Sequence, residues 1–309
     1  MSLHVVFGYG QIGPLLASRL AASGHQVRVV SRHRPKLPPG IEHLAGDASD
    51  EAFTRDAVRG ATAAYHCINV PYPQWFELLP RIGQSLRQAA LASAARLVVL
   101  DNLYMLGRPD APMTEATPLA PRSKKGELRA RLELDLLASR ERGLELAIGR
   151  ASDFFGPGVT GSAVLHPTNL KRLVAGKRVD VGGDPDAPHS YSYAPDVAAG
   201  LFTLGTSVRV DEPIWHLPVA FQGTTRALVE AVGRALGVDA KVGTLPGWMW
   251  LVAGLFSPMI REAKEMTYQW EGPFVLDDSR FRSAFGVEPT PRGEAIAATA
   301  AWIRERFGR

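Results

Sequence analysis

Residues 1–13 read MSLHVVFGYGQIG, a short apolar run that ends in the pattern Gly8-x-Gly10-x-x-Gly13. Residues 14–23 follow with leucines at helical spacing, and the order strand, glycine turn, helix is typical of dinucleotide-binding domains. Gly8 permits the tight turn and Gly10 lets the backbone approach a pyrophosphate, while Gly13 lets the helix pack against the strand. A glycine-rich turn without a ligand is the alternative. The predicted cofactor-binding residues of this turn are Gly8, Gly10, Gln11, Ile12 and Gly13.

Strand-like and helix-like segments alternate through the first half of the chain. After the opening strand, strands are expected over residues 26–31, 41–45, 61–68, 96–100 and 144–148, and helices up to residue 59 and over 76–94 and 127–142. Six short apolar strands separated by helices predict an α/β fold, a doubly wound parallel sheet of the Rossmann type with right-handed crossovers. A ligand is then expected across the carboxyl ends of the strands.

The second half of the chain is richer in glycine, proline and aromatic residues, as in FFGPGVTG (154–161). Helix-like segments return at residues 196–204, 224–236 and 295–306. We therefore expect a dinucleotide-binding domain over residues 1–150. Residues 151–309 should form mainly a smaller substrate-binding lobe, interleaved with the first domain and covering the cofactor.

Composition narrows the class of protein. The chain has 309 residues, 46% of them hydrophobic and 21% charged, as in ordinary globular proteins. Its 35 Lys and Arg exceed 31 Asp and Glu by little and form no basic block, so nucleic-acid binding is not implied. The single cysteine, Cys67, cannot form an internal disulfide and fits the reducing cytoplasm, where packing in the core is its expected role.

The longest apolar run, GWMWLVAGLFSPMI (247–260), contains Pro258 and is shorter than the roughly 20 residues that span a bilayer. We expect a buried helix or a wall of the substrate pocket there, and no stable membrane insertion. A helix lying in the membrane interface is the alternative.

The second predicted strand ends in Val30-Ser31-Arg32-His33-Arg34, without an acidic residue. In NAD-binding folds an acid usually lies there and binds the ribose 2′-hydroxyl. A guanidinium instead suits a 2′-phosphate, which it can hold through charge-assisted bonds. Ser31, Arg32 and Arg34 therefore predict NADP(H), with NAD less favoured. A solvated basic turn is the alternative.

Two further polar residues follow predicted strands. Asp47, beside Ala48, is placed to accept bonds from an adenine amino group, although capping of the next helix is an equal alternative. Asn69 follows the fourth strand, where it could meet the cofactor ribose; an ordinary turn asparagine is the alternative. Asp47, Ala48 and Asn69 complete the predicted cofactor site.

Several motifs resemble the extended short-chain dehydrogenase/reductase superfamily, in its NAD-dependent epimerase/dehydratase branch. The motifs are the glycine turn, GDASD (46–50), LYMLG (103–107), MTEATP (113–118), GRASDFFGPG (149–158), YSYAPDV (191–197) and FRSAFGVEPTP (281–291). The resemblance covers nearly the whole chain and is specific for the superfamily rather than for a substrate. It implies the Rossmann fold, a nicotinamide cofactor and a homodimer that can form through the 76–94 and 127–142 helices.

The chain departs from the family pattern at the residues that transfer protons. The family uses a Tyr-x-x-x-Lys pair with an upstream Ser or Thr. Here Lys125 holds the Tyr position, Arg129 the Lys position and Asn102 the Ser position. Phe7 also replaces the first glycine of the family's loop. The chain thus resembles the atypical subset, some members of which bind the cofactor without the standard chemistry.

The replacements are compatible with catalysis. Lys125 beside Arg129 is expected to release its proton more readily because like charges repel, so it could protonate a carbonyl oxygen or imine nitrogen. Arg129 could bind the ribose, and Asn102 could polarise a substrate oxygen. A helix terminus whose basic side chains face solvent is the alternative. Other candidate acids are Tyr104, which is the best substitute, Tyr72, Tyr191, Tyr193 and His166. An aromatic side chain that fills the pocket wall is the alternative for Tyr104, and a hydrogen-bonded surface histidine is the alternative for His166.

The sequence has no metal-ligand cluster, phosphate loop or serine-hydrolase elbow. The main hypothesis is therefore an NADP(H)-dependent oxidoreductase that transfers a hydride to or from a small carbonyl, imine or sugar-like substrate. Its pocket wall is expected to include Phe154, Phe155, Tyr191, Trp248, Trp250 and Trp270. An NADP-binding redox sensor with a degenerate site is the alternative, and an epimerase that keeps its cofactor bound is a third.

Overall fold

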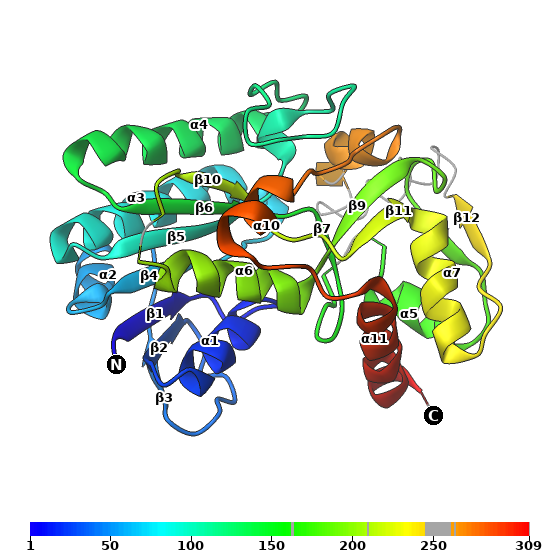
Figure 1. Ribbon diagram of the computed structural model, residues 1–309, viewed down its shortest axis with the longest axis horizontal. Helices are drawn as coiled ribbons and strands as arrows, with labels where there is room; N and C mark the ends of the chain where they lie inside the picture. Colours follow the sequence, from blue (N-terminus) through cyan, green and yellow to red (C-terminus); the bar gives the residue numbers. More distant parts are fainter. Residues whose placement is uncertain (162–163, 209, 245–260, 263, 309) are drawn as a thin grey trace.

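A seven-stranded parallel sheet forms one half of the molecule in the computed structural model (Figure 1). The structure describes residues 1–161, 164–208, 210–244, 261–262 and 264–308. The strands lie in the order β10-β6-β5-β4-β1-β2-β3. Their bounds are β1 Leu3–Phe7, β2 Gln26–Ser31, β3 Ile41–Ala45, β4 Ala63–His66, β5 Arg96–Asp101, β6 Leu146–Arg150 and β10 Ile214–His216. The predicted doubly wound α/β fold is confirmed, with β10 as an additional short strand.

Strand β1 lies in the middle of the sheet, where it pairs in parallel with β2 on one side and β4 on the other. Four of its five residues are buried, because helices cover both faces of a parallel sheet and leave neither face to water. The chain passes from β1 to β2 on one side and returns to β4 on the other. This reversal opens a crevice at the carboxyl end of β1, where such folds bind ligands.

Helices pack against both faces of the sheet (Figure 1). The apolar side chains of α1 (Gly13–Ala22) and α6 (Ala194–Thr206) form one core with one face of the strands. Those of α2 (Glu51–Val58), α3 (Trp75–Ser93) and α4 (Lys124–Ala138) form a second core with the other face.

Helix α4 begins at Lys124, three residues before the predicted start at residue 127. Ser123 explains this earlier start, since its Oγ accepts a hydrogen bond from the backbone N–H of Gly126 and so caps the helix. The predicted end at residue 142 includes a separate 3-10 turn, η3 (Ser139–Arg142), which Gly143 ends in the left-handed conformation.

The other half of the molecule is a smaller lobe with its own core. Its described residues form a three-stranded sheet, β11-β9-β7, a two-stranded sheet, β12-β8, and three helices. Their bounds are β7 Asp153–Phe155, β8 Val179–Val181, β9 Pro188–Tyr193, β11 Phe221–Thr224, β12 Val242–Thr244, α5 Pro167–Val174, α7 Thr225–Leu236 and α11 Arg292–Phe307. Between these elements the chain returns to the large sheet as α6 and β10. Near the lobe junction lie the 3-10 helix η4 (Lys264–Trp270) and α10 (Ser279–Phe285).

No helix in the described part of the chain combines the length and hydropathy needed to cross a bilayer. The apolar run 247–260, with Trp248 and Trp250, lies outside the described residues.

The turn between β1 and α1 depends on two glycines that touch. Gly8 adopts a φ of +96°, which glycine tolerates and other residues rarely adopt. A Cβ atom on Gly13 would lie 2.0 Å from the carbonyl oxygen of Gly8. Backbone atoms form this contact, so no side-chain rotation can relieve a substitution.

We therefore predict that Gly13→Ala destabilises the protein by about 2–4 kcal/mol, since the added methyl forces the helix away from the strand. Urea unfolding followed by circular dichroism measures this change. Gly83→Ala is the matched control: Gly83 lies inside α3, and its Cβ would meet no atom within 4 Å. The control should gain about 0.5–1 kcal/mol from helix propensity. A Gly13→Ala protein as stable as the wild type would contradict the argument.

Candidate functional site

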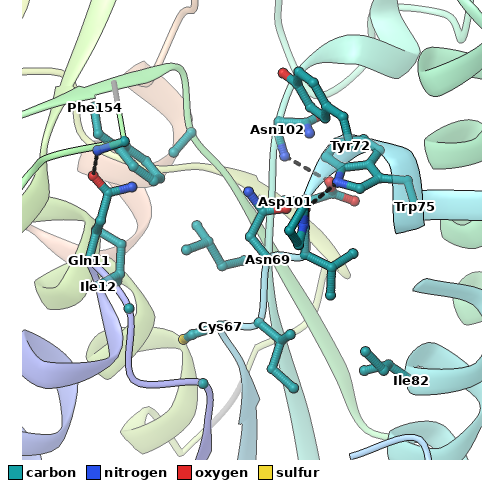
Figure 2. Close-up of a pocket in the computed structure, with 18 of the residues that line it drawn as sticks. Gln11, Ile12, Cys67, Asn69, Tyr72, Trp75, Ile82, Asp101, Asn102 and Phe154 are labelled. Carbon is teal, nitrogen blue, oxygen red and sulfur yellow. Dashed lines mark hydrogen bonds between the residues drawn. The ribbon is translucent and has the colours of Figure 1, made fainter. Parts of the chain in front are cut away.

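One cavity of about 1450 Å³ runs along the carboxyl ends of the large sheet and under the smaller lobe. Six of its lining segments each follow one strand, from β1 to β6 in chain order. These segments are residues 8–12, 30–35, 46–48, 67–72, 100–104 and 151–154. In Figure 2, Gln11, Ile12 and Phe154 lie on one side of this cavity and Tyr72, Trp75 and Asn102 on the opposite side.

The glycine turn forms one wall of the cavity. Gly10 lines it and is exposed, and a Cβ there would meet no protein atom within 4 Å. The fold itself therefore does not require glycine at this position, but a ligand whose phosphates approach the backbone does. Helix α1 begins at Gly13 with no side chain capping its N-terminus. The residues present fit a dinucleotide pyrophosphate at this helix end.

Gln11 links the glycine turn to the smaller lobe. Its side-chain Oε1 accepts hydrogen bonds from the backbone N–H groups of Thr160 and Gly161, at 3.0 and 2.8 Å. The neighbouring Ile12 is buried in the core beneath the turn and also lines the cavity. The turn and the lobe above it are thus held together across the cavity.

The end of β2 presents basic side chains to the cavity. Arg32 and Arg34 are exposed and line it, and the segment 30–35 contains no carboxylate. Ser31 donates a hydrogen bond from Oγ to the carbonyl of His33 and contacts His43 Nε2 at 3.0 Å, which holds this turn.

Asp47 does not cap the following helix, so the alternative role considered from the sequence, helix capping, is wrong. The cap of α2 is Asp50, whose carboxylate accepts a bond from the N–H of Phe53. Asp47 instead accepts a bond from the N–H of Ser49, which lowers the Asp47 pKa, with a further contribution from Arg32. Its carboxylate, the buried Ala48 and the exposed Asn69 all line the cavity.

Asn102, Tyr104 and Tyr72 lie together at the end of β5. Asn102 Oδ1 accepts the N–H of Tyr104 at 3.0 Å, and its amide nitrogen has no acceptor among the described residues. The hydroxyls of Tyr104 and Tyr72 are hydrogen-bonded at 3.0 Å. Burial raises the pKa of Tyr104 well above its ordinary value, and burial also raises that of Tyr72. Both hydroxyls therefore keep their protons and act as hydrogen-bond partners.

Lys125 is fully buried and is not among the residues that line the cavity. Its Nζ lies 2.6 Å from a carboxylate oxygen of Glu262, 2.5 Å from one of Glu265 and 5.0 Å from the centre of the Tyr72 ring. The sequence led us to expect Lys125 to be repelled by Arg129. Instead, the carboxylates of Glu262 and Glu265 compensate the charge of the Lys125 ammonium. The sequence alone could not reveal them, since they lie about 140 residues away along the chain.

Arg129 lines the cavity, but its charge is also compensated. Its Nη1 lies 3.2 Å from Asp101 Oδ1, and its guanidinium stacks over the Trp75 ring at 4.4 Å. Asp101 also accepts the N–H of Asn102. Sequence reasoning missed Asp101 and Trp75, although the position of Asp101 at the end of a strand is a usable signal.

The substrate half of the cavity lies beneath the smaller lobe. Phe154 and Trp270 line it as expected, together with Met266, Phe274 and His166. Phe155 and Tyr191 do not, because both are fully buried in the core of the smaller lobe. Cys67 also lines the cavity, and burial raises its pKa to about 12, so it remains a neutral thiol.

Arg150, the last residue of β6, and Asp153, the first residue of β7, lie in different surroundings. Arg150 is buried and forms a bidentate ion pair with Glu133 inside the core, at distances down to 2.6 Å. Asp153 faces the cavity and is bonded to His189 at 2.9 Å, a pair that sequence reasoning missed. Within the described part of the chain, no three His, Cys, Asp or Glu side chains gather as a metal site.

The chain is similar to proteins of known structure over its whole length. The Bordetella bronchiseptica enzyme WbmH, crystallised with NAD+, matches 99% of this chain and 100% of its own with 20% identity and a TM-score of 0.78. A double mutant of DesIV, a dTDP-glucose 4,6-dehydratase from Streptomyces venezuelae crystallised with NAD, matches 100% and 98% with 21% identity and a TM-score of 0.79.

Sequence comparison points the same way. UDP-glucuronic acid decarboxylase 1 of Xenopus tropicalis is 25% identical over 253 residues, which is 74% of this chain and 60% of that protein. The chain thus spans about three fifths of the length of this relative. The model of the NAD dependent epimerase/dehydratase family matches residues 5–215, which include the glycine turn and six of the cavity's lining segments. The chain belongs to the NAD-dependent epimerase/dehydratase family.

Proposed function

We propose that the chain is an NADP(H)-dependent oxidoreductase of the epimerase/dehydratase type that transfers a hydride to or from a small carbonyl, imine or sugar-like substrate. The observation that carries this proposal is the single cavity that joins the glycine turn to the apolar space under the smaller lobe. A dinucleotide lying along the strand ends would bring its nicotinamide near Asn102. The neighbours WbmH and DesIV, crystallised with NAD, support a dinucleotide in this fold.

The proposed cofactor contacts follow the cavity from one end to the other. Gly8, Gly10 and the start of α1 would hold the pyrophosphate, Asp47 the adenine and Asn69 a ribose. Arg32 and Arg34 would bind the 2′-phosphate of NADP, a preference that rests on the missing carboxylate at the end of β2. The bound cofactor supplies the hydride, and the protein supplies its position.

Asn102 is the residue we propose to polarise the substrate, because it lines the cavity and its amide N–H group has no acceptor in the described part of the chain. The Tyr72–Tyr104 hydroxyl pair would orient the reacting heteroatom. Arg129, stacked over the Trp75 ring, and Lys125, over the Tyr72 ring, would support this group.

A redox sensor is the second candidate, and one observation favours it. The residue at the family's tyrosine position, Lys125, is fully buried and ion-paired with Glu262 and Glu265. Such a protein would bind NADP(H) tightly and turn over no substrate. A homodimer is proposed for either function, with Phe76 of α3 and Leu134 of α4 exposed on the helices expected to meet.

We predict that Gly10→Ala weakens NADPH binding by about tenfold or more, because the methyl occupies space that the pyrophosphate needs. The same change should leave the free energy of unfolding within about 0.5 kcal/mol, since the methyl meets no protein atom. Fluorescence titration with NADPH and urea unfolding measure the two quantities. Unchanged NADPH affinity would argue against a pyrophosphate at this turn.

Arg32→Ala tests the cofactor preference. We expect NADPH affinity to fall by about 10–100-fold, the loss of one charge-assisted contact, and NADH affinity to stay within about twofold. The matched control is Arg59→Ala, an exposed arginine that does not line the cavity. Equal losses for the two nucleotides would refute the 2′-phosphate assignment.

Asn102→Ala tests the proposed chemistry. Turnover of NADPH with a panel of carbonyl compounds and neutral imines, whose reacting oxygen or nitrogen can accept a hydrogen bond, should fall by roughly 100-fold, the usual effect of removing a donor to the reacting atom. The Kd for NADPH should stay unchanged, because the amide faces the substrate side. Tight NADPH binding with no turnover of any compound by the wild type would instead favour the sensor.

A further inference from the structure

Asp153 places a carboxylate in the substrate half of the cavity. It is the first residue of β7, and its side chain lines the cavity with 19% of its surface exposed. Its Oδ2 accepts a hydrogen bond from His189 Nε2 at 2.9 Å, while Oδ1 has no partner among the described residues. His189 is 1% exposed and stacks with Trp270 and Phe274, which fixes the ring. The carboxylate is thus held in place through Oδ2, while Oδ1 is left without a partner among the described residues and can meet a substrate.

The net charge of the Asp153–His189 pair depends on the second ring nitrogen of His189, Nδ1. Its Nδ1 is buried and has no hydrogen-bond partner among the described residues. A protonated ring would bury a charged N–H group without an acceptor, which costs more than burying an unpaired lone pair. The neutral ring that donates from Nε2 is therefore the favoured form, and the pair carries one negative charge on Asp153.

No uncompensated cation opposes this charge in the described lining of the substrate half. Arg129 is matched by Asp101, and the lining residues between 151 and 166 and between 266 and 274 include no Lys or Arg. The sequence at 162–163, 245–260 and 263 contains none either. A nucleotide sugar carries a pyrophosphate, which needs cations or backbone donors, and here it would meet a carboxylate and aromatic rings.

We propose that the substrate half of the cavity takes a protonated imine on an apolar, ring-bearing body, with the Asp153 carboxylate as its counter-ion. This inference rests on the proposed function and names its substrate class. The aromatic lining from Phe154, Trp270 and Phe274 suits the body, and the carboxylate suits the positive nitrogen.

The reaction balances without a proton donor in the protein. A bound reduced nicotinamide would supply the hydride. The imine carbon would gain a C–H bond while the π electrons of the C=N bond became the nitrogen lone pair, so the substrate would lose its positive charge and the cofactor would gain one. Because the imine arrives protonated, the Tyr-x-x-x-Lys pair is unnecessary. This is consistent with Lys125 being ion-paired outside the cavity lining.

The test compares two probes of similar shape, the permanent cation N-methyl dihydroisoquinolinium and the neutral ketone tetralone. With NADPH, we expect kcat/KM for the cation to exceed that for tetralone by about 100-fold. Asp153→Asn should lower the value for the cation by at least about 30-fold and that for tetralone by less than about threefold. Asp110→Asn, an exposed acid outside the cavity lining, is the matched control.

A binding measurement separates this inference from the proposed function. Calorimetry measures the affinity of the wild-type protein for protonated N-methyl tetrahydroisoquinoline and for tetralone, and it does not depend on turnover. Failure to bind or oxidise NADPH would defeat the proposed function, while tighter binding of the amine would still support the anionic pocket. The inference would be overturned if the amine and the ketone bound equally well, or if Asp153→Asn left the affinity for both unchanged. Tighter binding of UDP-glucose than of the amine would also overturn it.

Discussion

The contact between Gly8 and Gly13 is the constraint on which the rest of the structure depends. A side chain on Gly13 would lie 2.0 Å from the Gly8 carbonyl, so helix α1 can approach β1 only because residue 13 is glycine, and Gly8 permits the turn through its positive φ. That approach sets the helix end beside the strand end, and the chain's return to β4 opens the crevice there. The cavity at the strand ends and the contacts proposed for the cofactor depend on this crossing.

Charge compensation divides the site into two regions with different chemistry. Near the end of β5, Arg129 is matched by Asp101, and behind it Lys125 is matched by Glu262 and Glu265. At the end of β2, in contrast, Arg32 and Arg34 are exposed with no carboxylate in their own segment. Exposed positive charge thus lies where a phosphate is proposed, in reach of the Asp47 carboxylate, and negative charge lies on Asp153 in the substrate half.

The local sequence was sufficient to predict most strands of the large sheet and the position of the glycine turn. Short apolar strands followed by turns and helices have few other arrangements, so the doubly wound sheet could be predicted. Strand β10 could not be predicted, because a strand of three residues is too short to show a hydrophobic alternation. Its place in the sheet depends on pairing with β6, which is distant in the sequence. Phe155 and Tyr191 were expected in the pocket because aromatic residues suit either a pocket or a core, and only packing distinguishes them.

The sequence by itself determined the fold class, the family and the residues of the glycine turn, since each depends on neighbouring residues whose spacing is visible in the chain. The tertiary structure alone decided which charges are free and which are paired. Lys125 meets Glu262, and Asp153 meets His189, across 137 and 36 residues of chain. The physical reason is that an ionisable group's role depends on its partners and its burial, and folding brings both from distant parts of the sequence.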